Sequence, residues 1–292
     1  MGNSSLHIHW YPGHIAKAER QLKEKLNLVD VVIEVRDARI PLSSSYTNIE
    51  KLLGDKPRLL LLNKADLVDK EELKSWIKYL KDTTKCPIIT TDAKGAKDLA
   101  LVVKNAVDLA EPRIQALMSK GLLRRAARAM VVGMPNVGKS SVINKLTKSS
   151  KTKIGAKAGV TRQQQWVRIN PKLDLLDTPG IIPTKQENQL QAAKLAFVSS
   201  VSENAYAPEE VAQELLNLLS ESKYKQIVCD FYKVEDLTLY TIAQSRNWIL
   251  KSDSLDTERT AKYVLKDFRD GRLGKFILDE IPLIDNDSNC TD

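Results

Sequence analysis

The stretch GMPNVGKS, from Gly133 to Ser140, is the part of this chain that says most about its fold. It fits the pattern G-x-x-x-x-G-K-[ST], follows the apolar run AMVVG and precedes the helical pattern SSVINKLTK. A strand, a glycine-rich loop and a helix in this order form a phosphate cradle, in which backbone N–H groups, the lysine and the helix amino terminus meet the phosphates. We therefore predict a nucleotide-phosphate site made of Asn136, Val137, Gly138, Lys139, Ser140 and Ser141.

A magnesium site is expected beside this cradle, because phosphate-bound Mg²⁺ takes hydroxyl and carboxylate oxygens. The Ser140 hydroxyl can bind the ion directly. Asp177 in DTPG, after the run LDLL, is placed to reach it through water, and Thr161 in AGVTR stands where a switch threonine would bind the same metal. The Gly180 N–H of DTPG is placed to meet a γ-phosphate.

A second motif, LLLLNKADL from Leu59 to Leu67, predicts which base is bound. Four leucines suit a short buried strand, and Asn63, Lys64 and Asp66 follow at its carboxyl end. The Asp66 carboxylate can accept from both N1–H and the exocyclic amine of guanine, an arrangement that adenine does not offer. A site built on such bonds rejects the wrong base strongly, so we predict GTP.

A third loop, TDAK after the apolar run PIIT, resembles the Ser-Ala-Lys loop that also touches guanine. Its members here are Asp92, Ala93 and Lys94, with aspartate in place of the usual serine.

The order of these motifs indicates a circular permutation, since the base reader precedes the phosphate cradle. Moving the block from VDVVIEVRDA through TDAK behind the block from AMVVG through DTPG restores the conventional GTPase order. Strands are expected at 29–35, 59–62, 87–90, 129–133, 166–169 and 173–177, and helical patterns lie between several of them. This alternation favours an α/β fold with a mostly parallel sheet.

A small all-helical C-terminal domain is expected after this circularly permuted P-loop GTPase domain. Helical patterns occupy 188–200, 208–222, 237–248 and 256–274, and the boundary is predicted near residue 188, dividing the chain into 1–188 and 189–292 with an acidic tail. The permutation makes the DTPG switch run directly into these helices. A change at the γ-phosphate is therefore expected to reach them.

The distribution of charge favours an RNA partner. The chain has 292 residues and a net charge of +8, yet the stretch from Pro112 to Leu173 holds fourteen Lys and Arg residues and no Asp or Glu. One nucleotide cannot use fourteen cations, and such a field would steer the protein towards nucleic acid. The candidate RNA contacts are Lys17, Arg20, Arg124, Arg125 and Arg128. No stretch approaches the roughly 20 apolar residues of a membrane span, and three scattered cysteines indicate a reduced cytosolic compartment.

Together the motifs WYPGHIAKA, DARIP, NKADL, GMPNVGKS and LLDTPGI resemble the YlqF/RbgA subfamily of circularly permuted GTPases, the ribosome biogenesis GTPase A family. The likeness covers nearly the whole chain and is weakest across residues 186–279. It implies action late in assembly of the large ribosomal subunit, binding of the precursor particle and its rRNA, and a helical RNA-contacting C-terminal domain. It also implies hydrolysis stimulated by potassium, with Asn136 coordinating K⁺. A monomer without membrane or DNA partners is expected.

His14 is the candidate for orienting the attacking water. The position after DTPG holds Ile181, whose side chain cannot hydrogen-bond to water. His14 lies in the segment Pro12-Gly13-His14, interpreted as a polar loop beside Lys17 and Arg20, and the family's corresponding histidine is assigned this role. An ordinary surface histidine is the alternative.

Two functions from different classes remain open. The first is a Mg²⁺- and K⁺-assisted GTPase, slow alone and faster on a pre-ribosomal particle. The second is a GTP-regulated RNA-binding scaffold in which hydrolysis is incidental. A P-loop ATPase is disfavoured by Asn63, Lys64 and Asp66. The expected location is the bacterial cytoplasm, or an organelle stroma or matrix if the chain has been trimmed, because no Arg- and Ser-rich transit segment is visible.

Overall fold

The computed structural model describes residues 12–92, 97–148, 166–176, 180–181 and 189–282. In these residues seven strands form one sheet in the order β3-β2-β1-β4-β6-β5, with β7 pairing β4 off this path. The strands are β1 (Val31–Asp37), β2 (Arg58–Asn63), β3 (Ile88–Thr90), β4 (Ala127–Gly133), β5 (Trp166–Asn170), β6 (Leu173–Leu176) and β7 (Gly180–Ile181). All pairs are parallel except the antiparallel pair of β5 with β6.

The strand order confirms the predicted permutation. The strand that leads into GMPNVGKS, β4, lies in the middle of the sheet and pairs with β1, the first of the described strands. The strand of the base-reading motif, β2, pairs with β1 on the other side. Because both strands run parallel to β1, the carboxyl ends of β2 and β4 lie on the same side of the sheet, although their motifs lie 70 residues apart in the sequence.

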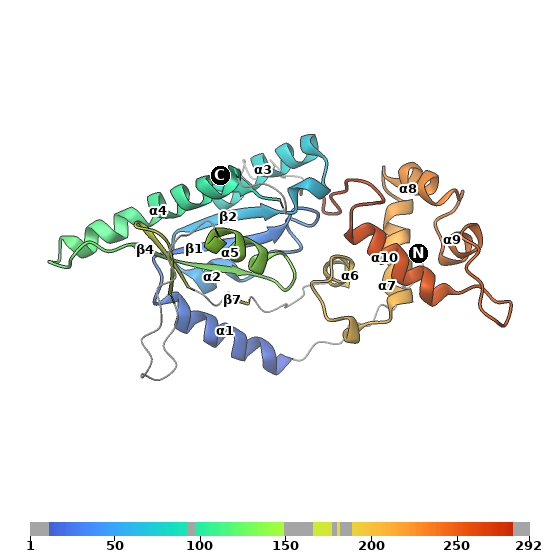
Figure 1. Ribbon diagram of the computed structural model, residues 1–292, viewed down its shortest axis with the longest axis horizontal. Coiled ribbons are helices and arrows are strands. Elements are labelled where there is room, and N and C mark those ends of the chain that lie inside the picture. Colours follow the sequence, from blue (N-terminus) through green and yellow to red (C-terminus); the bar gives the residue numbers. More distant parts are fainter. Residues whose placement is uncertain (1–11, 93–96, 149–165, 177–179, 182–188, 283–292) are drawn as a thin grey trace, which may run out of the picture.

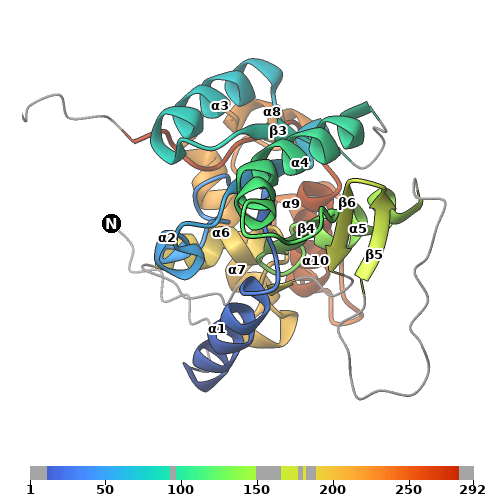
Figure 2. The same ribbon diagram turned by 90° about the vertical axis from the view of Figure 1, so that its left-hand side faces the viewer.

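Helices cover both faces of the sheet because successive strand side chains point to opposite faces. On one face Val31, Ile33 and Val35 share a buried cluster with residues of α4 (Lys97–Met118) and α5 (Lys139–Lys148). On the other face Val32 packs with α1 (Pro12–Leu26) and α2 (Ile49–Leu53), while Leu60 and Leu62 pack with α3 (Lys70–Thr84). Figure 2 shows α1 and α4 on opposite sides of β4.

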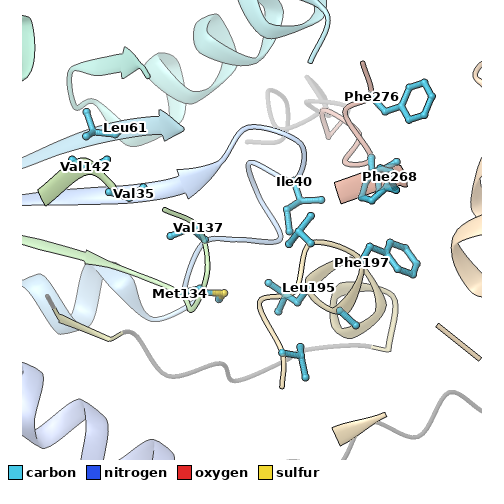
Figure 3. Packing of buried hydrophobic residues seen from close by; sticks show 14 of the residues in the cluster. Val35, Ile40, Leu61, Met134, Val137, Val142, Leu195, Phe197, Phe268 and Phe276 are labelled. Atoms are coloured by element: carbon cyan, nitrogen blue, oxygen red, sulfur yellow. The ribbon is translucent and has the colours of Figure 1, made fainter. Parts of the chain in front are cut away.

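The helical part of the chain lies beyond the carboxyl ends of the strands (Figure 1). It consists of α6 (Gln189–Phe197), α7 (Pro208–Ser220), α8 (Lys225–Tyr232), α9 (Leu239–Ser245) and α10 (Thr257–Arg269). One cluster of buried apolar side chains runs from the sheet through Ile40 and Met134 to Leu195, Phe197 and Phe268 (Figure 3). The predicted boundary near residue 188 falls beside the segment 182–188, outside the described residues, and the division into two domains stays a prediction.

Three helices differ from the sequence-based expectation. The loop interpretation of Pro12-Gly13-His14 is wrong, because these residues form the first turn of α1. Proline is well suited to this place, since its fixed φ matches the helix and its missing N–H would have no partner in the first turn. The short helices α2 and α8 were not predicted. No helix in the described ranges is long and apolar enough to cross a membrane.

Candidate nucleotide-binding site

The phosphate cradle has the expected strand, loop and helix. The strand β4 ends at Gly133, and α5 begins at Lys139, so the amino terminus of α5 faces the loop. Gly138 has φ 102°, and a Cβ there would lie 2.0 Å from Nδ2 of Asn63. A glycine is required at this position because both the backbone conformation and the close approach of Asn63 exclude a side chain.

The ammonium group of Lys139 points into the phosphate loop from Gly133 to Ser140. Its Nζ donates to the Met134 carbonyl oxygen at 2.6 Å, and the residue is 7% exposed. Burial lowers the pKa of Lys139 to about 8. No carboxylate of the described residues pairs with this ammonium group. A bound polyphosphate would supply the missing negative partner. Ser140 and Ser141 are exposed in the first turn of α5.

The base-reading loop is bonded directly to the phosphate cradle. Asn63, the last residue of β2, donates from Nδ2 to the Val137 carbonyl oxygen at 2.9 Å. Lys64, in the left-handed conformation with φ 62°, donates from Nζ to the Asn136 carbonyl oxygen at 3.0 Å. Asp66 follows in the 3-10 turn Ala65–Leu67 and is half-buried. The predicted guanine and phosphate contacts therefore belong to one site.

Thr91, the first residue of the loop TDAK, holds the base-reading loop from the neighbouring strand, a role that the motif itself did not indicate. Its hydroxyl donates to Oδ1 of Asn63 at 3.0 Å, and its carbonyl oxygen accepts from the Ala65 N–H at 3.1 Å. The motif TDAK placed Thr91 near the guanine, but only its position beside the end of β2 shows that it supports Asn63 and Ala65. Asp92 follows, and its carbonyl oxygen accepts from Nζ of Lys145 at 2.6 Å. Ala93 and Lys94 lie outside the described residues.

The metal predictions are only partly covered by the described residues. Ser140 presents a hydroxyl at the start of α5, next to the buried Lys139, as a Mg²⁺ ligand of this kind requires. Thr161 and Asp177 lie outside the described residues. Gly180 begins β7, which pairs with the end of β4, so the backbone that follows DTPG runs beside the cradle.

Asn136, the expected potassium ligand, contacts the helical part of the chain. Its Nδ2 donates to the Ser199 carbonyl oxygen at 2.6 Å, and Ser200 donates from Oγ to the Pro135 carbonyl oxygen at 2.8 Å. The bond to Ser199 uses the amide nitrogen and not Oδ1, the atom that a cation would need. Ser199 and Ser200, which follow α6, thus bind Asn136 and Pro135 of the cradle. No sequence motif predicted these contacts.

The predicted catalytic and RNA-contacting residues of the amino terminus lie on α1. His14 belongs to the first turn of this helix, and its side chain is outside the described part of the structure. The helix packs against β7, the strand that follows DTPG. Lys17 and Arg20 are exposed on the same helix.

Arg124, Arg125 and Arg128 of the basic stretch lie at or near the start of β4, at the opposite end of this strand from the cradle, and each already has a partner. Arg125 makes a bidentate pair with Asp30 at 2.6 and 2.9 Å, and Arg124 makes one with Glu111 at 2.9 and 2.8 Å. The Arg128 guanidinium lies 5.0 Å from the centre of the Trp166 ring. Asp30 and Glu111, which lie outside the basic stretch, thus neutralise Arg125 and Arg124. The number of Lys and Arg residues in the stretch therefore overstates the positive charge available to a partner.

Comparison with known proteins shows to which family the chain belongs. A family model described as 50S ribosome-binding GTPase matches residues 128–238, beginning inside β4. The ribosome biogenesis GTPase A of Bacillus cereus is 39% identical over 276 residues, which cover 92% of each chain. The chain belongs to the ribosome biogenesis GTPase A family. It is a GTPase with the circularly permuted fold.

Relatives in other bacteria and solved structures support the same assignment. The ribosome biogenesis GTPase A of Thermotoga maritima is 32% identical, over 91% of this chain and 92% of the relative. The structure of GNP-bound YlqF from T. maritima matches with a TM-score of 0.63 and 27% identity, covering 92% of this chain and 100% of that chain. A GDP-bound YlqF structure matches with a TM-score of 0.62 over 89% of this chain.

Proposed function

We propose that the protein hydrolyses GTP while bound to a precursor of the large ribosomal subunit, late in its assembly. The observation that carries this proposal is the bonded pair of loops, in which Asn63 and Lys64 join the base-reading motif to the phosphate cradle at Val137 and Asn136. The relatives are named for ribosome biogenesis, and the matching family model is described as 50S ribosome-binding. The proposed setting is the bacterial cytoplasm, with the protein acting as a monomer.

Each part of the nucleotide has proposed contacts. Asp66 reads the guanine edge, with Asp92, Ala93 and Lys94 beside the base. The backbone of the cradle from Asn136 to Ser141 and the Lys139 ammonium bind the phosphates, and the Gly180 N–H meets the γ-phosphate. Ser140, Thr161 and, through water, Asp177 would hold Mg²⁺, and Asn136 would hold K⁺. The cations would neutralise negative charge on the phosphate oxygens.

His14 is proposed to orient the attacking water. Ile181, which follows DTPG, offers only an apolar side chain, so another element must provide the polar group. The packing of α1 against β7 supports this role, because it keeps the helix of His14 next to the backbone that follows the switch. Lys17 and Arg20 on the same helix are proposed to meet rRNA, which would couple particle binding to the position of His14.

The proposed RNA contacts Arg124, Arg125 and Arg128 are harder to test than those of α1, because Arg125 and Arg128 are only partly exposed and the exposed Arg124 is paired with Glu111. Arg125 neutralises Asp30, a carboxylate that is 1% exposed, so RNA phosphates would compete with an existing buried pair. Asp30 also pairs with Arg113 at 3.1 Å, so removing Arg125 would take away one of its two guanidinium partners and destabilise the fold. The exposed Lys17 and Arg20 therefore provide the cleaner test of RNA binding.

Turnover on the particle tests the proposal. We expect large-subunit precursors to stimulate GTP hydrolysis by the unaltered protein, more at high than at low K⁺. His14→Ala should bind GTP and particles normally but lose about 10²–10⁴-fold of the stimulated rate, the usual contribution of one positioned proton-transfer group. The measurement is phosphate release with and without purified particles.

A variant with Lys17→Ala and Arg20→Ala is the matched control on the same helix. It should bind particles more weakly, and the slope of its log–log salt dependence should fall by up to about 0.7–0.9 for each RNA phosphate that it no longer neutralises. Normal stimulated turnover by His14→Ala would remove His14 from the mechanism. Absence of stimulation in the unaltered protein would contradict the particle-dependent reaction itself.

A further inference from the structure

The carboxylate of Asp37, at the end of β1, is completely buried between two cationic side chains. Its Oδ2 lies 2.8 Å from the Lys64 ammonium and 2.9 Å from Nη2 of Arg39. Its Oδ1 accepts from the Arg39 backbone N–H at 3.1 Å and from Nε at 3.0 Å. Asp37 and Arg39 belong to the motif DARIP, which has no role in the nucleotide site as described so far.

Lys64 is the link between this carboxylate and the nucleotide site. Its ammonium contacts both Asp37 and the carbonyl oxygen of Asn136 in the cradle. The lysine side chain is flexible, with four rotatable bonds. Two acceptors on different elements restrict it to one conformation. The base-reading lysine is therefore held before a nucleotide arrives.

Arg39 continues the connection to the helical part of the chain. Its guanidinium lies 5.3 Å from the centre of the Phe268 ring on α10, and Nη1 donates to the Arg269 carbonyl oxygen at 3.3 Å. The Arg39 carbonyl oxygen accepts from the Leu278 N–H at 2.8 Å. Arg269 in turn donates to the carbonyl oxygens of Ala196 and Phe197 at the end of α6.

The electrostatics favour a positioning role over a purely stabilising one. Burial alone would raise the pKa of Asp37, but the charges of Arg39 and Lys64 outweigh it and hold the pKa well below its usual range. Apolar side chains of similar volume often stabilise a fold as well as a buried ionic cluster does. What such a cluster adds is a fixed direction for each charged group, here for Lys64.

We propose that Asp37 and Arg39 are positioning residues for GTP recognition, with Asp37 orienting Lys64 and Arg39 fastening that carboxylate to the carboxyl end of α10. The inference rests on the proposed base-reading role of Asn63, Lys64 and Asp66. It also places the base-reading loop under the influence of α10, so a partner that displaces α10 would weaken nucleotide binding.

A double-mutant cycle on GDP affinity tests the inference. Asp37→Asn should weaken GDP binding by about 10- to 100-fold, as expected when an interaction with a charged group is removed. The variant with Asp37→Asn and Lys64→Ala together should bind no worse than Lys64→Ala alone, because residues that act through one another are not additive. The measurement is isothermal titration calorimetry on the full chain.

Asp279→Asn is the matched control for a general loss of stability. Asp279 is a second buried carboxylate between the two parts of the chain, bonded to Lys194 and to the Ser43 hydroxyl and backbone. Its substitution should lower the melting temperature and leave GDP affinity within about twofold, a change smaller than the removal of one hydrogen bond to GDP would cause. Arg39→Lys, which keeps the charges balanced, should weaken GDP binding by about 10-fold and serves if Asp37→Asn does not fold.

Two results would overturn the inference. One is unchanged GDP affinity in Asp37→Asn, or in Arg39→Lys where that variant is the one measured. The other is a double mutant whose loss is the product of the single losses. A separate variant, Asp66→Asn, tests the assignment on which the inference rests, because it should exchange guanine for xanthine preference. If Asp66→Asn still prefers GTP, the base-reading assignment fails; if it switches while Asp37→Asn binds normally, only the positioning role fails.

Discussion

At the scale of single residues, the burial of Lys139 fits the phosphate-binding role proposed for its ammonium group. The ammonium is buried against a carbonyl oxygen, a partner that offsets only part of the lost hydration. Burial brings its pKa from the usual 10.5 to about 8. Between these two pH values the folded protein binds fewer protons at this group than the unfolded chain does. Its contribution to the free energy of unfolding therefore rises with pH in this window.

Nucleotide binding should reverse this shift, because the phosphate charges favour the ammonium form. At pH 8 about half of the free protein lacks the proton, so GDP binding should take up about 0.5 proton, whereas uptake from this group at pH 6.5 should be near zero. GDP affinity should fall as pH rises above about 8. Calorimetry in buffers of different ionisation enthalpy measures the uptake. Guanosine, which lacks phosphates, is the control, and equal proton uptake by GDP at both pH values would contradict the explanation.

At the scale of elements, the end of α6 connects the helical part to the phosphate cradle. The chain leaves this helix through Ser199, in the left-handed conformation, and the Ser200 N–H returns to the Leu195 carbonyl oxygen at 2.8 Å. This ending aims the Ser199 carbonyl and the Ser200 hydroxyl at Asn136 and Pro135. The order of the motifs predicted coupling only through the switch that precedes α6. The described hydrogen bonds add a second route, through the cradle itself.

Ser200→Ala should weaken the contact between the end of α6 and the phosphate cradle without disturbing the sheet. The loss of one neutral hydrogen bond at a residue that is 1% exposed should lower the free energy of unfolding by about 0.5–1.5 kcal/mol. GDP should dissociate faster because the cradle loses a support at Pro135. Denaturant unfolding and stopped-flow release of a fluorescent GDP measure the two effects.

Ser220→Ala on α7 removes a comparable but exposed serine hydrogen bond, to the Asn217 carbonyl oxygen, and is the control. It should change neither quantity appreciably. GDP release from Ser200→Ala at the unaltered rate would show that the end of α6 does not support the cradle.

At the scale of the whole molecule, the GTPase fold and the helices share a core. Ile40, Met134 and Val137 from loops at the sheet edge belong to the same buried cluster as Leu195, Phe197 and Phe268. The buried pair of Lys194 and Asp279, at 3.0 Å, lies at this junction and holds the backbone at Ser43. A permuted GTPase fold therefore exposes apolar surface if the helices are removed.

A chain truncated after Pro183 should bind GDP at least about 10-fold more weakly than the full chain, the equivalent of about 1.4 kcal/mol. It should also melt at a lower temperature, because the sheet edge loses its apolar cover. The full chain should unfold in one cooperative transition. Calorimetric scanning and GDP titration test these expectations, with a chain ending at Pro282 as the control. Unchanged GDP affinity after truncation at Pro183 would refute the dependence of the site on the helices.

Local patterns in the sequence were sufficient for much of the fold. All six predicted strands and the permuted order are confirmed, because glycine-rich loops, apolar runs and the motif NKAD are signals carried by adjacent residues. Four of the five described C-terminal helices, all except α8, were also predicted from their apolar spacing and, for α7, from Pro208 at its start. The loop interpretation at Pro12 failed because Pro-Gly can begin a helix as well as a turn.

Which distant groups meet became visible only in three dimensions. The class of site was already set by the amino-acid sequence, since each motif binds with residues a few positions apart. The same sequence could not show that Asp37 holds Lys64, that Ser199 meets Asn136, or that Asp30 and Glu111 neutralise two arginines of the basic stretch. The physical reason is that an ion pair or hydrogen bond depends on distance in space. Sheet order and helix packing bring these residues together. Their separation along the sequence does not predict these contacts.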